Sequence, residues 1–284
     1  MGAEEVSRLT PPNGTSQVEV TKKSNVGISS LFSTYAMSES VAVHIRVATV
    51  ADLDELAAMN QRAFISSPPQ TYFSGANAPL TMDSKDEKRR NNQTRFLKFL
   101  IRRSWSLGAR ITVAVIPGGE NGADRIVGAT IWRPPITGEN KSPSMLSALR
   151  MGLFSVLVSW GISAMTRISD LVQSSEHVLE DGYASRNLPG TPEDSWYLQL
   201  AGVDPDFQGK GYMSMLLQEA FKHAPDATFT LEATTPRSRD VYKHYAFEVV
   251  REVVVGKGKV DGLGVNASGD AATGFPIYPM IKVP

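Results

Sequence analysis

Apolar and polar residues follow two different periods along the chain, one typical of strands and one typical of helices. Residues 43–47 alternate apolar and polar side chains, which predicts a strand with one buried face. Thr49 and Asp52 then have the spacing of a capping box, and apolar residues at helical spacing continue to Phe64, so we expect a helix there. Helical spacing returns over residues 84–107. The early part of the chain therefore combines strand and helix.

A hairpin and a helical insertion come next. Two apolar runs, at residues 109–116 and 125–132, flank a glycine-rich turn, which predicts two antiparallel strands. An apolar stretch at helical spacing then extends from Met145 to about Val172, and we interpret it as one bent helix or two short ones. We therefore expect residues 139–192 to form a helical insertion between the third and fourth strands.

Strands and helices alternate through the last third of the chain. We predict strands at residues 196–203, 227–234, 247–255 and 277–283, and helices at 209–224 and 237–246. Two earlier segments lack a sustained period. Residues 66–81 are rich in turn-forming residues and predict a loop that exposes Tyr72 and Phe73. Residues 1–42 predict a disordered or loosely docked leader, which leaves one folded domain at 43–284.

Charge and composition exclude several classes of protein. The 29 Lys and Arg residues balance 29 Asp and Glu residues, whereas proteins that bind duplex nucleic acid usually carry a basic excess. The basic stretch at residues 84–110 keeps a nucleic-acid interface open as an alternative, although a solvated helix face is the simpler interpretation. The chain has no cysteine, which excludes disulfides and thiol nucleophiles, and its four histidines are dispersed, so we expect no metal site.

The chain carries no signal for export or membrane insertion. Its first residues lack the cationic start and apolar run of a signal peptide. The sixteen uncharged residues at 151–166 are fewer than the roughly 20 that a spanning helix needs. This segment could pack in the core, cover a hydrophobic acceptor as a lid, or form a partner surface. We expect a cytoplasmic protein without a membrane span.

A turn between a strand and an amphipathic helix is the most informative segment. The strand ends at residues 204–205 (DP), and residues 208–212 (QGKGY) lead directly into the helix. Glycines at such a junction let backbone N–H groups approach a ligand, and the helix N-terminus favours anions, which predicts a phosphate or pyrophosphate cradle. A Walker loop would continue with Lys and then Ser or Thr after its second glycine, whereas Tyr212 follows Gly211, and a Rossmann fingerprint would need two more glycines.

This segment resembles motif A of the GNAT acyl-CoA N-acyltransferases, in which a strand ending in Val-x-Pro precedes Gln/Arg-x-x-Gly-x-Gly/Ala. Residues 203–205 (VDP) and 208–213 (QGKGYM) occupy those positions, with Met213 in place of the family's last small residue. The resemblance covers about residues 43–284. It implies an α+β fold in which helices flank a mixed, mostly antiparallel central sheet.

Two later strings support the resemblance. Residues 231–234 (LEAT) and 236–247 (PRSRDVYKHYAF) are similar to the family's second cofactor-side strand and the helix after it, with Ala246 in place of a glycine. LEAT and PRSRDVY are similar to strings of fungal members. The resemblance implies acetyl-CoA, or another short acyl-CoA, as co-substrate. The residues implied for its binding are Leu200, Ala201, Val203, Gln208, Gly209, Lys210, Gly211, Tyr212, Met213 and Tyr242.

Acyl transfer to an amine needs a proton acceptor for the amine and a proton donor for the leaving thiolate. Tyr242 matches the family's general acid, and a phenol of ordinary pKa about 10 is a suitable donor to a thiolate whose conjugate acid has a pKa of about 8.5. Glu232 is our first candidate for the base, because a carboxylate in an apolar cleft can have a raised pKa; Glu193 and Asp194 are the alternatives. We place the acceptor near Tyr72, Phe73, Trp132 and Trp196.

The predicted function is transfer of an acetyl group from acetyl-CoA to the amine of a small metabolite, by direct attack on the thioester. The long apolar insertion favours a hydrophobic acceptor. An acyl-CoA-binding module without catalysis, favoured by Met213 and Ala246, and a protein or peptide N-acetyltransferase are the alternatives. We expect no metal and no nucleic-acid partner, and a monomer or a homodimer.

Overall fold

The computed structural model describes residues 43–118, 124–136 and 144–284, and these described residues belong to one compact unit. The leader predicted at residues 1–42 lies outside the described residues, as do the first residues of the predicted insertion, 139–143.

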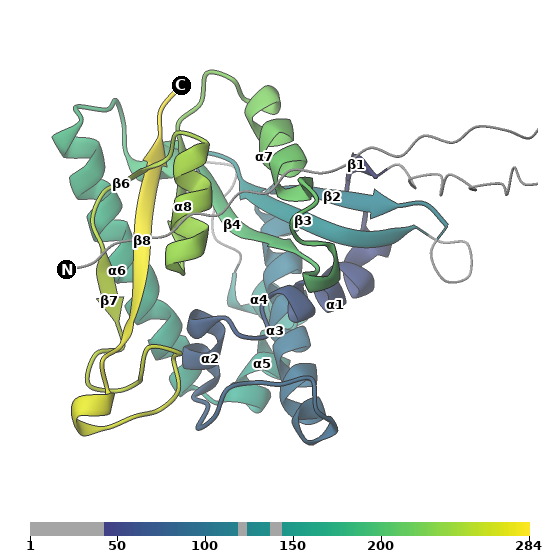
Figure 1. Ribbon diagram of the computed structural model, residues 1–284, viewed down its shortest axis with the longest axis vertical. Helices are drawn as coiled ribbons and strands as arrows, with labels where there is room; N and C mark the ends of the chain where they lie inside the picture. The colour runs from purple at the N-terminus through teal and green to yellow at the C-terminus, as the bar shows by residue number, and fades with distance from the viewer. Residues whose placement is uncertain (1–42, 119–123, 137–143) are drawn as a thin grey trace, which may run out of the picture. The chain divides into compact units, whose positions relative to one another are not determined.

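One sheet organises the described part of the chain (Figure 1). Its strands follow the order β1-β2-β3-β4-β5-β8-β6, with β7 also paired to β8. All neighbouring pairs are antiparallel except β4 and β5, which are parallel. The prediction of a mixed, mostly antiparallel sheet is confirmed. The strands are β1 (His44–Val47), β2 (Arg110–Ile116), β3 (Arg125–Arg133), β4 (Trp196–Val203), β5 (Phe229–Ala233), β6 (Glu248–Val249), β7 (Val253–Val255) and β8 (Phe275–Lys282).

Helices cover both faces of the sheet. They are α1 (Leu53–Ala63), α2 (Pro68–Ser74), α3 (Glu87–Ser106), α4 (Met145–Met151), α5 (Leu153–Trp160), α6 (Ser163–Ser185), α7 (Tyr212–His223) and α8 (Pro236–His244). Ile111 and Val113 of β2 belong to the core beneath α1 and α3, whereas Ala114 packs with Leu216 of α7. Because both faces are buried, β2 and β3 read as nearly continuous apolar runs.

The helical insertion between β3 and β4 is confirmed, but it contains three described helices rather than one or two. Gly152 and Gly161 separate α4, α5 and α6 with backbone φ angles of +113° and +75°. Helix α6 also continues past the predicted end at Val172. Its buried residues, including Val178 and Tyr183, keep helical spacing there, but polar residues between them interrupt the apolar run.

The loop predicted at residues 66–81 is wrong in part, because residues 68–74 form helix α2. Pro68 and Pro69 occupy its first turn, where proline is compatible with a helix. Tyr72 and Phe73 are buried rather than exposed: their rings pack 5.7 Å from Phe275 and 6.1 Å from Phe96. Long-range aromatic contacts therefore decide a segment whose local sequence indicates a turn.

The strand predicted at residues 247–255 is interrupted. β6 ends with Val249 opposite Met280 and β7 begins with Val253 opposite Ile277. Residues 250–252 therefore oppose only two residues of β8, as in a bulge. One of those two is Pro279, which has no N–H to donate to the ladder.

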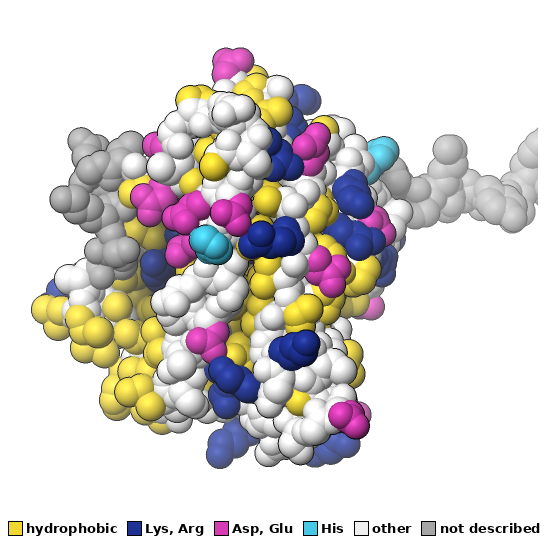
Figure 2. All heavy atoms as spheres, turned by 90° about the vertical axis from the view of Figure 1, so that its left-hand side faces the viewer, with side chains coloured by type: hydrophobic (Ala, Val, Ile, Leu, Met, Phe, Trp, Pro, Cys, Tyr) yellow, Lys and Arg dark blue, Asp and Glu magenta, His cyan; other side chains and the backbone are white. Residues whose placement is uncertain are grey.

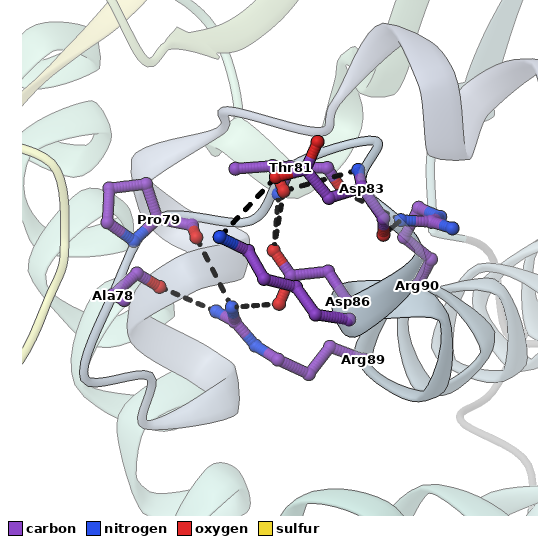
Figure 3. A network of polar contacts seen from close by, with 8 residues as sticks. Ala78, Pro79, Thr81, Asp83, Asp86, Arg89 and Arg90 are labelled. Carbon is purple, nitrogen blue, oxygen red and sulfur yellow. Dashed lines mark hydrogen bonds and ion pairs between the residues drawn. The ribbon is translucent and has the colours of Figure 1, made fainter.

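Basic residues at the start of α3 hold the preceding loop in place (Figure 3). Arg89 and Arg90 donate to backbone carbonyl oxygens of residues 78–83 at 2.5–3.2 Å. Asp86 accepts from the backbone N–H and hydroxyl of Thr81 and from Arg89, and these bonds hold its pKa at about 2, below the ordinary 3.8. Two cations of the predicted basic stretch thus serve the fold, which weakens the alternative of a nucleic-acid interface.

The insertion has apolar residues on two faces. Leu153 and Val156 of α5 are buried, whereas Phe154 and Val158 on its other side are 66% and 69% exposed. Figure 2 shows hydrophobic side chains gathered along one lower edge of the molecule. The strongly exposed apolar residues of the insertion are Met145, Leu146, Phe154, Val158 and Ile162. Helix α5 is therefore both a wall of the interior and an apolar surface. Among the described residues, no helix is long and apolar enough to cross a membrane.

Candidate active site

β4 and β5 diverge in the middle of the sheet. They pair in parallel at only three residues of each strand, ending at Leu198 and Leu231. β4 then continues to Val203, paired on its β3 side with an irregularity that leaves Gln199 without a partner residue. Backbone N–H and C=O groups on its other edge are therefore open to an extended ligand, in the manner of an added strand.

The glycine turn lies where β4 ends. Gly209 and Gly211 have φ angles of +77° and +82°, and no atom lies within 4 Å of where a Cβ would stand on either residue. Residue 211 caps α7, whose first backbone bond runs from the N–H of Met215 to the oxygen of Gly211. The N–H groups of residues 209–214 thus stay available at a helix N-terminus. This arrangement fits the pyrophosphate of an acyl-CoA, with room beside both glycines.

A buried carboxylate anchors this turn. Asp204 is 1% exposed, and its Oδ2 accepts from Nε and Nη2 of Arg62 at 2.9 and 2.7 Å. Its Oδ1 accepts from the backbone N–H of Asp206 at 3.2 Å. The turn is therefore tied to α1, the helix that carries Arg62.

We expect Asp204→Asn to lower the free energy of unfolding by about 1–3 kcal/mol, because hydrogen bonds to a charged group are worth that much. Chemical denaturation measures the change. Asp206→Asn makes the same chemical change two residues away on an exposed side chain and should cost less than about 0.5 kcal/mol. Equal losses in the two variants would contradict the anchoring role of Asp204.

The opening between β4 and β5 leads into a cavity of about 1290 Å³. Its walls come from the glycine turn, from α8 and from the helices α2, α3, α5 and α6. The predicted site residues that line it are Leu200, Ala201, Val203, Gln208, Gly209, Gly211, Tyr212, Met213, Glu232, Tyr242 and Phe73, with Glu193 among the alternatives. The fold therefore brings most of the predicted site together around one space.

Four predicted site residues do not line this cavity. Trp132 is fully buried, with its ring 5.2 Å from that of Phe229, and Trp196 packs 5.4 Å from His223. The hydroxyl of Tyr72 donates to Asp170 at 3.1 Å. Lys210 lies over the ring of Phe207, outside the cavity lining. Asp194, an alternative base, also lies outside and accepts from Thr191.

Strand alternation explains why the sequence missed the cavity residues beside these tryptophans. Arg133 follows Trp132 and Tyr197 follows Trp196, so each points to the opposite face of the sheet from its tryptophan, and both line the cavity. The guanidinium carbon of Arg133 lies 4.3 Å from the centre of the Tyr197 ring. Had the opposite face of each strand been assigned to the site, the prediction would have included Arg133 and Tyr197.

Glu232 is partly open to the cavity and otherwise enclosed by protein. Its carboxylate accepts from the hydroxyl of Tyr197 at 2.5 Å and from the hydroxyl of Ser175 on α6. Burial raises its pKa above the ordinary 4.5, while the two hydroxyls and the charge of Arg133 act in the opposite direction. A carboxylate with a raised pKa that is accessible from a cavity can act as a general base.

Tyr242 lines the same cavity from α8. Its ring packs edge-on 5.8 Å from that of Phe247, and its hydroxyl donates to no described residue. Burial raises its pKa well above the ordinary 10, so the phenol keeps its proton. At the end of this helix, Ala246 has a φ of +64°, the left-handed conformation in which the related motif has glycine. The turn is therefore kept despite the substitution.

The described residues contain no group of three or more His, Cys, Asp or Glu placed to hold a metal ion. The polar groups in the cavity are instead proton donors, proton acceptors and three arginines, of which Arg103 and Arg133 are half-buried and Arg237 is exposed.

Comparison with known proteins finds a family match over part of the chain and a shared fold. Residues 178–247, from within α6 to the end of the α8 turn, match the sequence model of the Acetyltransferase (GNAT) family. No curated protein matches the chain. Among solved structures, one described as histone acetyltransferase HPA2 and related acetyltransferase, from Corynebacterium glutamicum, is 21% identical, with a TM-score of 0.50 over 85% of this chain and 96% of that one.

Two further structures have the same TM-score of 0.50. Arylalkylamine N-acetyltransferase 2 from Aedes aegypti is 14% identical over 85% of this chain and 98% of its own. The C-terminal condensation domain of Ebony, in complex with beta-alanyl-dopamine, is 12% identical over 86% of this chain and all of its own. At these identities the likeness is one of fold.

Proposed function

We propose that the chain is a GNAT acetyltransferase, the family whose sequence model residues 178–247 match, and that it transfers an acetyl group from acetyl-CoA to the amine of a small acceptor. The carrying observation is that the glycine turn, the free edge of β4, Glu232 and Tyr242 all border one cavity. With its pyrophosphate at the glycine turn, CoA would extend its pantetheine arm along β4, toward Glu232 and Tyr242.

The residues of the cavity supply each part of the reaction. Backbone N–H groups of residues 209–214 hold the pyrophosphate, and the edge of β4 holds the amides of the pantetheine arm. Acetyl-CoA supplies an activated thioester. Glu232 accepts the proton that the amine loses as its nitrogen bonds to the carbonyl carbon, and Tyr242 gives its proton to the sulfur as the C–S bond breaks.

The walls of the cavity favour a small acceptor over a polypeptide. Helices α3, α5 and α6 enclose the end beyond Glu232 with apolar side chains such as Phe96, Leu153 and Val156. Two proteins that share the fold are consistent with a small acceptor: one is described as an arylalkylamine N-acetyltransferase, and the other is described in complex with beta-alanyl-dopamine. The proposal for this chain depends on its own cavity.

Release of thiol from acetyl-CoA over a panel of small amines tests the function, together with calorimetric titration of CoA. We expect CoA to bind and at least one amine to accelerate thiol release. CoA binding without turnover on any small amine or peptide would favour the alternative of a binding module. Absence of CoA binding would overturn the proposal.

We expect Tyr242→Phe to lower kcat by about 10- to 100-fold, less than the upper range of acid catalysis, because a thiolate leaves more readily than most groups. Tyr278→Phe removes the same hydroxyl from a buried tyrosine outside the cavity and should leave kcat unchanged. Steady-state kinetics measure both. Unchanged turnover in Tyr242→Phe would show that this tyrosine is not the acid.

A further inference from the structure

Three arginines line the cavity; Arg237 is exposed, and the two half-buried ones have no anionic partner among the described residues. Arg103, near the end of α3, and Arg133, at the end of β3, both line it. Neither side chain makes a hydrogen bond to, or lies within 4.0 Å of, a carboxylate among the described residues. Nε of Arg133 is buried and has no acceptor there.

The two charges also act on each other. Burial lowers the pKa of Arg103 below its ordinary value, and the positive charge of Arg133 lowers it further. Two guanidinium groups that lie near each other in a half-buried site repel, and an anion bound between them would relieve this repulsion. Most other arginines of the described chain have such a partner; Arg62 and Arg110, for example, pair with Asp204 and Glu219.

The phosphates of CoA are not that anion. Arg133 pairs with Tyr197 at the beginning of β4, whereas the glycine turn follows Val203 at the end of the strand. Six residues of strand separate the two positions by about 20 Å. The pyrophosphate and the arginine pair therefore belong to opposite ends of the cavity.

The acidic residues of the cavity act on Arg133 through space, but none of them forms an ion pair with either arginine. The carboxylate of Glu232 already accepts hydrogen bonds from the hydroxyl groups of Ser175 and Tyr197. Glu176 also lines the cavity; burial raises its pKa and the charge of Arg133 lowers it. Neither Glu176 nor Glu193, the third carboxylate of the lining, forms an ion pair with either arginine. An anion supplied by a ligand would complete the site.

Resting on the proposed function, we propose that the acceptor carries a carboxylate in addition to its amine, and that Arg103 and Arg133 bind this carboxylate. A planar guanidinium matches a carboxylate with two parallel hydrogen bonds. The amine would then lie at Glu232. Tyr197 connects Glu232 to Arg133, because the Tyr197 hydroxyl donates to the carboxylate of Glu232 and the Tyr197 ring lies beneath the guanidinium of Arg133. The apolar side chains of α3 and α5 complete the site for an amino acid with an apolar side chain.

Matched pairs of amines test this acceptor class: tryptophan against tryptamine, and phenylalanine against phenethylamine. Each pair differs only in the carboxylate. We expect kcat/KM to be at least about 10-fold higher for the amino acid, through a lower KM, since one charge-assisted hydrogen bond is worth that factor or more. Phosphoethanolamine tests a phosphate in place of the carboxylate. Equal or better turnover of tryptamine, or a preference for the phosphate, would overturn the proposal.

Variants of the pair assign the effect to these residues. Arg133→Met and Arg103→Met should each bring the ratio of kcat/KM for tryptophan to kcat/KM for tryptamine close to one. A change in the pKa of Glu232, which the charge of Arg133 influences, would affect both amines alike and leave this ratio unaltered. Arg102→Met is the control, since Arg102 neighbours Arg103 on α3 but is exposed and does not line the cavity. Equal losses on tryptophan and tryptamine in the Arg133 variant would indicate a structural role and overturn the proposal.

A binding measurement separates this inference from the function on which it rests. Titration of N-acetyltryptophan and N-acetyltryptamine into the CoA complex requires no turnover. Tighter binding of the carboxylate, lost in Arg133→Met, supports the inference even if no amine is acetylated, in which case the proposed function fails alone. Equal binding of both compounds with turnover intact would overturn the inference and leave the function standing.

Discussion

Glu232→Gln is expected to lower kcat by about 10²- to 10⁴-fold, the range that general acid–base catalysis contributes. The amide keeps the shape of the side chain and can still accept from Tyr197 and Ser175, but it cannot take a proton from the amine. KM for acetyl-CoA should change little, because Glu232 lies beyond the glycine turn. Steady-state kinetics give both constants. Glu180→Gln, the same change on an exposed residue of α6, should have no effect.

The pH dependence of this variant gives a second readout. In the wild type, kcat/KM should fall as pH drops through the raised pKa of Glu232, since only the carboxylate accepts a proton. The Gln variant should lack that limb. The free energy of unfolding should change with pH in the opposite direction to activity. A carboxyl group whose pKa is raised in the folded protein stabilises the fold below pH 4.5, and this contribution is lost as pH rises through the raised pKa. Wild-type activity without an acidic limb would exclude Glu232 as the base.

Replacement of both Gly209 and Gly211 by Ala should raise KM for acetyl-CoA at least about 100-fold. The left-handed φ angles of both residues are unfavourable for alanine, so the turn rotates and some N–H groups no longer point at the pyrophosphate. Loss of two hydrogen bonds to a charged group, at about 1.5–3 kcal/mol each, accounts for the effect. Calorimetric titration of CoA and steady-state kinetics measure it.

A matched control separates this effect from backbone strain. Gly258 has the same φ of +77° as Gly209, and no atom lies within 4 Å of where its Cβ would stand, but it belongs to the loop after β7. Gly258→Ala should carry a similar cost in stability per substituted residue and leave CoA affinity unchanged. If the double variant binds CoA as tightly as the wild type does, the glycine turn is not the phosphate site.

Much of the proposed co-substrate site was predictable because it depends on consecutive residues. The turn at residues 208–212 is defined by two glycines and the helix after them, and Val203 and Met213 flank it in the chain. Side chains of the acceptor end come from distant segments. Arg103, Arg133 and Ser175 lie on α3, β3 and α6, and no local pattern marks them as neighbours. Tyr197 and Arg133 were also missed because the wrong face of each strand was assigned to the site.

The sequence by itself determined the order of most strands and helices, though not α2, the three helices of the insertion or the break between β6 and β7; it also determined the position of the insertion and the glycine turn. These features depend on periodicity and backbone conformation within about ten residues. Only the tertiary structure decided that Tyr72 and Phe73 form part of a buried helix, that Trp132 is a core residue and that Arg133 faces the cavity. It also decided the pKa of Glu232, because burial and the hydroxyls of Ser175 and Tyr197 come from elements that meet only when the sheet and α6 are assembled. The direction of a side chain and the charge that it carries depend on these long-range contacts.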